Sequence, residues 1–120
     1  MANELSVNYG INYSKGTTNP DTDQVARSFS ITVSGDPRTS GVQTIGTTEE
    51  QLVLGDVSSV GVVEIFNLDS TNYLEVGGTT GVYTLKILPG EGYVYRSTTN
   101  NVYCKANTAA VKVAYKIFSA

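Results

Sequence analysis

The feature that most constrains the fold is an alternation of apolar and polar residues that begins close to Met1 and lasts for ten positions. Its apolar members are Leu5, Val7, Tyr9, Ile11 and Tyr13. Successive side chains of a β-strand point to opposite faces of a sheet, so this period of two predicts a long strand with one apolar face. A second alternation follows and is interrupted by Arg27; its apolar members are Val25, Phe29, Ile31 and Val33.

Shorter apolar segments continue to the end of the chain. We expect strands at residues 42–45, 51–54, 60–67, 73–76, 82–88, 93–96, 102–106 and 110–118. Between them lie segments such as "GDPRTSG", "LDSTN" and "LPGEG", whose Gly, Pro, Asn, Asp and Ser favour reversals. Apolar residues do not recur at helical spacing. The chain is therefore predicted to be all-β, with about eight to ten strands in an antiparallel β-sandwich or jelly-roll-like fold that forms a single domain over residues 1–120.

The segment "LPGEG" raises the question of whether a carboxylate at a turn is a working site. Pro89 presets φ, Gly90 and Gly92 permit unusual backbone angles, and Glu91 is left at the tip. The interpretation is a tight reversal in which Glu91 is an intersubunit ion-pair residue or a solvated turn residue.

Catalytic chemistry has few candidate residues. The chain contains no His, which excludes Ser-His-Asp and Cys-His nucleophile systems and the usual zinc sites. Glu49 and Glu50 are adjacent, so in a strand they would point to opposite faces and could not readily flank one substrate; a solvated segment is the preferred interpretation. We expect no enzymatic activity and no cofactor.

One loop resembles the start of a calcium site. Asn19, Asp21 and Asp23 stand at alternate positions, but Gln24 and Ser30 occupy the places of the glycine and glutamate that such a loop requires. An Asx-type turn in an exposed loop over residues 15–24 is the preferred interpretation, and an ion site is the alternative.

Charge is distributed unevenly along the chain. The net charge is −3, residues 1–81 hold ten acids and three bases, and the remainder holds five bases with Glu91 as its one acid. This balance does not suggest nucleic-acid binding. Two interpretations are open: the two halves face each other in one sandwich, or a basic face docks on an acidic partner.

Two further features concern location. No apolar run approaches the roughly 18–20 residues of a membrane span, so we expect a soluble protein made in the cytosol without membrane insertion. The single Cys104 excludes an internal disulfide, and we expect its thiol to be buried and inert.

Tyrosine is enriched near the basic residues of the second half. The chain has eight Tyr and no Trp, and Tyr with Arg is typical of protein interfaces, although aromatic faces also stack on sugars. The candidate interface consists of Glu91, Tyr93, Tyr95, Arg96, Tyr103, Lys105, Lys112 and Lys116.

Three segments carry a resemblance to a known class of protein. They are "VVEIFNLDSTNYLEVG", "YTLKILPGEGYVYR" and "VYCKANTAAVKVAYKIF". In this order of turns and strands, residues 60–118 resemble small all-β virion structural proteins of tailed bacteriophages.

The resemblance implies a subunit of the virion, made in the host cytoplasm and most simply a capsid decoration or cement protein. Its expected partners are the major capsid protein or other virion proteins, and a homotrimer is the first expectation for its own oligomeric state. The alternative is a receptor-binding or glycan-binding β-module associated with a tail or fibre.

Overall fold

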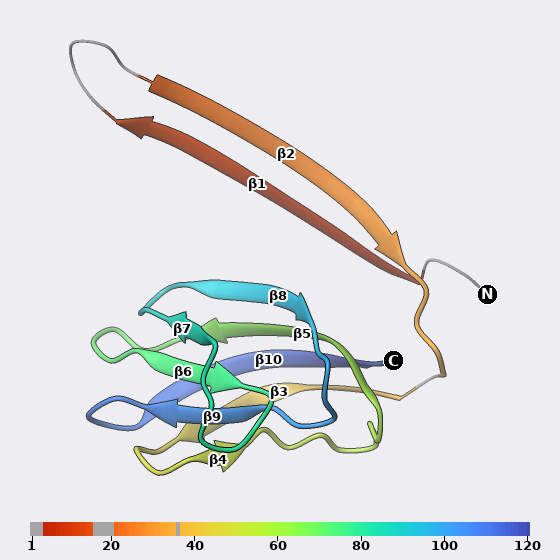
Figure 1. The fold of residues 1–120 in the computed structure, drawn as a ribbon, viewed down its shortest axis with the longest axis vertical. Coiled ribbons are helices and arrows are strands. Elements are labelled where there is room, and N and C mark those ends of the chain that lie inside the picture. The colour runs from red at the N-terminus through yellow and green to blue at the C-terminus, as the bar shows by residue number, and fades with distance from the viewer. Residues whose placement is uncertain (1–3, 16–20, 36) are drawn as a thin grey trace. The chain divides into compact units, whose positions relative to one another are not determined.

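The computed structural model describes residues 4–35 and 37–120 except 16–20, and the side chains of 14, 15 and 21–24 are also outside the description (Figure 1). The described residues form strands and turns and no helix, as predicted. The strands are β1 (Leu5–Lys15), β2 (Asp21–Ile31), β3 (Arg38–Ile45), β4 (Glu50–Gln51), β5 (Val60–Asn67), β6 (Leu74–Gly77), β7 (Leu85–Ile87), β8 (Gly92–Arg96), β9 (Tyr103–Ala106) and β10 (Val111–Ser119). The chain divides into two compact units, Met1–Val33 and Ser34–Ala120, whereas the sequence pattern indicates one domain.

The first unit is a hairpin of β1 and β2. The two strands pair antiparallel without a register shift, from Leu5 opposite Ile31 to Lys15 opposite Asp21. The predicted first strand is confirmed. The second strand begins at Asp21, before the apolar alternation starts at Val25, because the backbone ladder continues through polar residues that carry no apolar signal.

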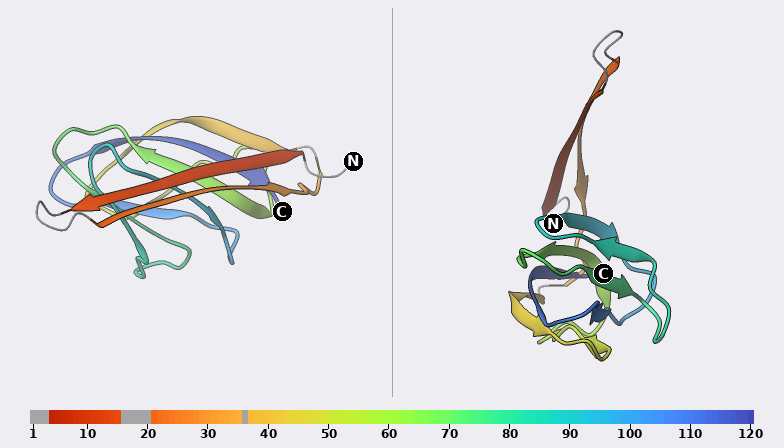
Figure 2. Two further views of the ribbon diagram at one scale, coloured as in Figure 1. Left: turned by 90° about the horizontal axis from the view of Figure 1, so that it is seen from above. Right: turned by 90° about the vertical axis from the view of Figure 1, so that its left-hand side faces the viewer.

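The second unit is an antiparallel β-sandwich of two four-stranded sheets, with strand orders β3-β10-β5-β8 and β4-β9-β6-β7 (Figure 2). Side chains from the inner faces of both sheets form one buried core. Its largest fully buried apolar members are Ile45, Leu52, Ile65, Leu74, Ile87 and Ile117. Non-polar area removed from water by this core is the main source of the sandwich's stability.

Some strand limits differ from the prediction. The segment 35–41 was expected to be a turn, but β3 begins at Arg38 because β10 is long enough to pair Phe118 with it. Conversely, the expected strand 51–54 is reduced to β4, because the Val53 N–H donates to the Gln43 side-chain oxygen (3.0 Å) rather than to a neighbouring strand.

Side-chain hydrogen bonds join the two sheets at their edges. Gln43 donates from Nε2 to the carbonyl of Gln51 (3.0 Å), and the Tyr115 hydroxyl donates to the carbonyl of Val53 (3.0 Å). At β7 and β8, the Tyr93 hydroxyl donates to the carbonyl of Lys86 (3.2 Å). These contacts fix the sheets against each other at the open sides of the sandwich.

Asn67 organises the loop that follows β5. It is fully buried, and its Nδ2 donates to the carbonyls of Asn72 (3.0 Å) and Ile87 (3.0 Å), while its Oδ1 accepts from the Asp69 N–H (2.8 Å). Hydrogen bonds from the backbone N–H groups of Asn72 and Thr71 lower the pKa of the Asp69 carboxyl. The "NLDSTN" segment therefore fixes the conformation of this loop, because its polar side chains form hydrogen bonds with the backbone groups of the loop.

Candidate docking surfaces

The structure distributes the predicted interface residues over four places. Arg96, Lys112 and Lys116 project from the outer face of β3-β10-β5-β8, which the register and burial of these strands define. Tyr103 and Lys105 alternate with buried Cys104 and Ala106 and so lie on the outer face of the other sheet. Tyr93 and Tyr95 lie on the inner side of β8, and Glu91 belongs to the turn before it.

Glu91 is held by its own turn. The Glu91 N–H donates to the carbonyl of Leu88 (3.0 Å), and Gly90 has φ +79°, which are features of a type II turn with Pro89 at its second position. The Leu88 N–H donates in return to Glu91 Oε1 (3.0 Å). The tight reversal expected from "LPGEG" is present, and the exposed carboxylate caps it.

Tyr93 and Tyr95 hold the sandwich together. The Tyr93 ring bridges β8 to β7 through the hydroxyl contact with Lys86. Tyr95 packs against the buried core, and burial raises the pKa of its phenol. Both residues therefore have structural contacts within the chain.

The outer face of β3-β10-β5-β8 is basic. We call this surface the basic face, and its charged members are Arg38, Glu64, Arg96, Lys112 and Lys116. Burial raises the pKa of the Glu64 carboxyl. Lys116, which lies opposite Glu64 in the ladder, partly offsets this rise because its positive charge favours the carboxylate. Sequence reasoning missed Arg38 because it falls in a segment with strong turn signals.

Apolar side chains lie among these charges. Val42 is 60% exposed, Val94 48% and Phe66 37%. Within the ladders, Val42 and Phe66 are both opposite Ala114, and Val94 is opposite Glu64. Exposed apolar groups flanked by Arg and Lys resemble a protein interface, in which an apolar centre is surrounded by a polar rim.

Two tyrosines contact lysines of the other sheet, β4-β9-β6-β7. Lys86 Nζ lies 4.3 Å from the centroid of the Tyr73 ring, and Lys105 Nζ lies 6.0 Å from that of Tyr83. These are cation–π distances. Tyr103 lies on the outer face of this sheet on β9, opposite Gln51 and Gly77.

Glu49 makes contacts that the sequence did not suggest. It accepts hydrogen bonds from the Thr80 hydroxyl, the Gly81 N–H (2.7 Å) and the Tyr83 hydroxyl (2.6 Å). The Thr80 contact is the main cause that lowers the pKa of Glu49, and the Glu49 contact raises the pKa of Tyr83 to about 12. The expected solvated carboxylate instead ties a loop together, and no local pattern signals partners more than thirty residues away.

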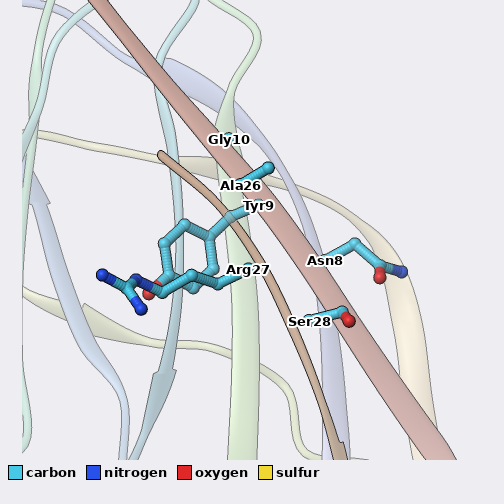
Figure 3. A pocket seen from close by; sticks show the side chains of 6 residues that line it. All are labelled: Asn8, Tyr9, Gly10, Ala26, Arg27 and Ser28. Carbon is cyan, nitrogen blue, oxygen red and sulfur yellow. The ribbon is translucent and has the colours of Figure 1, made fainter. Parts of the chain in front are cut away.

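The hairpin presents a third surface. Its apolar residues share one side of the ladder with Arg27, and we call this side the hairpin face, made of Leu5, Val7, Tyr9, Ile11, Tyr13, Val25, Arg27, Phe29 and Ile31. Ile11 is 57% exposed, Tyr13 50%, Phe29 48% and Tyr9 44%. Figure 3 shows Tyr9 and Arg27 on one side of the hairpin and Asn8 and Ser28 on the other, around a hollow lined also by Gly10 and Ala26.

Metal ligands and the single thiol are the remaining groups that could carry chemistry. In the part of the chain that the structure describes, no three His, Cys, Asp or Glu side chains are grouped to hold a metal ion. Asn19 and the side chains of Asp21 and Asp23 lie outside that part. Cys104 is free and buried, as expected, and burial raises its pKa to about 12.

Among the described residues, no helix has the length and apolar character to cross a membrane. No protein-family model matches the chain, and comparison with curated proteins and with solved structures finds no significant match.

Proposed function

We propose that the protein is a non-enzymatic structural component of a bacteriophage virion that binds the outside of the capsid shell and reinforces it. The observation that carries the proposal is the basic face, where four cations surround exposed Val42, Phe66 and Val94 with Glu64 as the acid among them. The chain as a whole has a net charge of −3, so this concentration of cations is local. The resemblance of residues 60–118 to virion structural proteins supports the same role.

The mechanism is bridging between shell subunits. A rigid sandwich that contacts two shell proteins adds association free energy across the joint between them, where internal DNA pressure acts. Complementary charge accelerates association and selects the partner, while the apolar centre provides burial. Lys112 and Lys116 keep the role expected from the sequence, with Arg38 and Arg96 beside them; Lys105 lies on the other sheet and is not part of this surface.

Charge reversal tests this proposal. Shells purified from particles that lack the protein are mixed with the wild-type protein or with the Lys112→Glu/Lys116→Glu variant. We expect at least a tenfold loss of affinity, since each reversed charge is repelled by the acidic surface that attracted it. The matched control is Lys86→Glu/Lys105→Glu on the other sheet, which is expected to bind like the wild type.

The proposal fails if the two double variants bind equally well while circular dichroism shows both to be folded. Wild-type protein that does not bind the shell at all would contradict it more strongly. Reinforcement is measured separately, as the temperature at which particles release DNA with and without the bound protein.

A glycan-binding module of a tail or fibre is the second proposal, favoured by Tyr73 and Tyr83, which contact lysines of the other sheet, and by Tyr103 on its outer face. Sugar stacking needs an open ring face. Lys86 lies over the Tyr73 ring, and the Tyr83 hydroxyl is bound to Glu49, so two of the three tyrosines are already engaged. Two results together would favour this function over decoration. The wild-type protein binds glycans on an array and the Tyr103→Ala variant does not, and the wild-type protein does not bind the capsid shell.

A further inference from the structure

The hairpin needs a cover that its own two strands do not provide. A two-stranded hairpin alone in water is marginally stable, and stability requires more strands or packing of its apolar side. Tyr9, Ile11, Tyr13 and Phe29 are each about half exposed, all on one side of the ladder. An apolar surface of this kind marks an interaction site.

We propose that the hairpin face is a self-association surface: it packs against the hairpin face of a second copy, with the two hairpins parallel and Arg27 of each copy against Tyr9 of the other. The inference concerns contacts between copies and holds whether or not the basic face binds a capsid shell.

The area available fits such an interface. A half-exposed aromatic or large aliphatic side chain still has roughly 100 Å² to bury, so these four residues supply roughly 400 Å² per copy. Leu5, Val7, Val25 and Ile31 lie on the same side and are partly exposed. Two faces together reach about 1,000 Å², the lower limit for a specific protein interface.

The order of residues along the ladder makes the face self-complementary in one orientation. When two hairpins pack face to face in parallel, each residue of β1 lies over the β2 residue of the same row in the other copy. The rows then match Leu5 with Ile31, Val7 with Phe29 and Ile11 with Val25. Within each hairpin, Tyr9 is the cross-strand partner of Arg27. In the parallel pair, the guanidinium of Arg27 in one copy therefore lies against the Tyr9 ring of the other copy, which is a favourable cation–π contact.

The antiparallel orientation centred on the same row lacks this match. It places Arg27 over Arg27 and Tyr9 over Tyr9, and two guanidinium groups brought together in an apolar interface repel each other. Charge therefore selects the parallel arrangement.

The basic face of another copy is a poorer partner for the hairpin. Arg27 would meet a surface that carries Arg38, Arg96, Lys112 and Lys116. Glu64 is the acid on that surface, and Lys116 already lies opposite it. Like charges brought together in this way oppose association, whereas the hairpin face offers Arg27 an aromatic ring.

Sedimentation velocity of the full chain over a range of concentrations tests the association. Wild type is expected to form dimers, and Ile11→Asp, which places a charge on the hairpin face, is expected to weaken association at least tenfold. Asn12→Asp adds the same charge on the opposite side of the same strand and is expected to associate like the wild type. A wild-type monomer at all concentrations, or equal weakening by both variants, would overturn the proposal.

Cross-linking tests the orientation and does not depend on a disruptive substitution. A tagged Ile11→Cys copy is co-expressed with a Val25→Cys copy and treated with a short bis-maleimide; the parallel arrangement places these thiols in the same row across a sheet spacing of about 10 Å, so a cross-link between copies is expected. The control pairs Ile11→Cys with Phe29→Cys, two rows away. Equal yields, or a higher yield in the control, would contradict the parallel arrangement, while shell binding by the basic face is measured independently.

Discussion

The hairpin and the sandwich are built from strands with the same alternation of apolar and polar residues, but their apolar sides end in different surroundings. In β10, Val111, Val113 and Ile117 are fully buried under the facing sheet. In β1, Tyr9, Ile11 and Tyr13 occupy equivalent alternate positions and remain about half exposed. Alternation thus identifies a strand and its apolar side, and it does not identify what covers that side.

The comparison also separates two kinds of stability. The sandwich has a buried apolar core of its own, and every buried side-chain nitrogen or oxygen among the described residues has a hydrogen-bond partner. The hairpin has a continuous backbone ladder between its strands, but large apolar side chains on one side of it are about half exposed. Its stability is therefore expected to depend on protein concentration, because copies supply the missing cover by mass action.

The largest difference is expected from one substitution made in both regions. Ile65→Ala removes a fully buried side chain and is expected to lower the free energy of unfolding of the sandwich by about 2–5 kcal/mol. Ile11→Ala, at a 57% exposed position, is expected to change it by less than about 0.5 kcal/mol when the protein is dilute. Urea unfolding at low concentration measures both, and equal losses would break the comparison.

A smaller difference is expected from asparagine. Asn67→Ala leaves the carbonyls of Asn72 and Ile87 without their buried donor and is expected to cost about 1–3 kcal/mol in the unfolding free energy. Asn12→Ala, at an exposed hairpin position, is expected to be neutral within about 0.5 kcal/mol. If both variants unfold at the same urea concentration as the wild type, the loop does not depend on Asn67.

The smallest effect is expected at Glu49 and depends on pH. Hydrogen bonds from Thr80, Tyr83 and Gly81 lower its folded pKa below the ordinary 4.5, so they stabilise the fold fully above that value. The stabilisation is lost as the pH falls through the lowered pKa. The difference in thermal midpoint between wild type and Glu49→Gln should therefore shrink between about pH 6 and about pH 3. A difference that is constant or grows would contradict the contact.

Much of the fold was predictable because local patterns encode it. The strand over residues 60–67 has the predicted bounds, and the "LPGEG" turn has the expected geometry, since a Pro-Gly pair and alternating side chains act within a few residues. The division of the interface candidates was not predictable. Tyr93 and Arg96 belong to one strand but project to opposite sides of it, and Arg38 joins the basic face through a ladder with Phe118, far away in the sequence.

Hydrogen–deuterium exchange at two protein concentrations tests the central claim most directly, because it reads the hairpin and the sandwich in one experiment. Amides of Leu5–Lys15 and Asp21–Ile31 are expected to gain protection as the concentration rises, while those of Val60–Asn67 and Val111–Ser119 stay equally protected. Protection of the hairpin that does not change with concentration would contradict the claim that copies of the chain cover its apolar side.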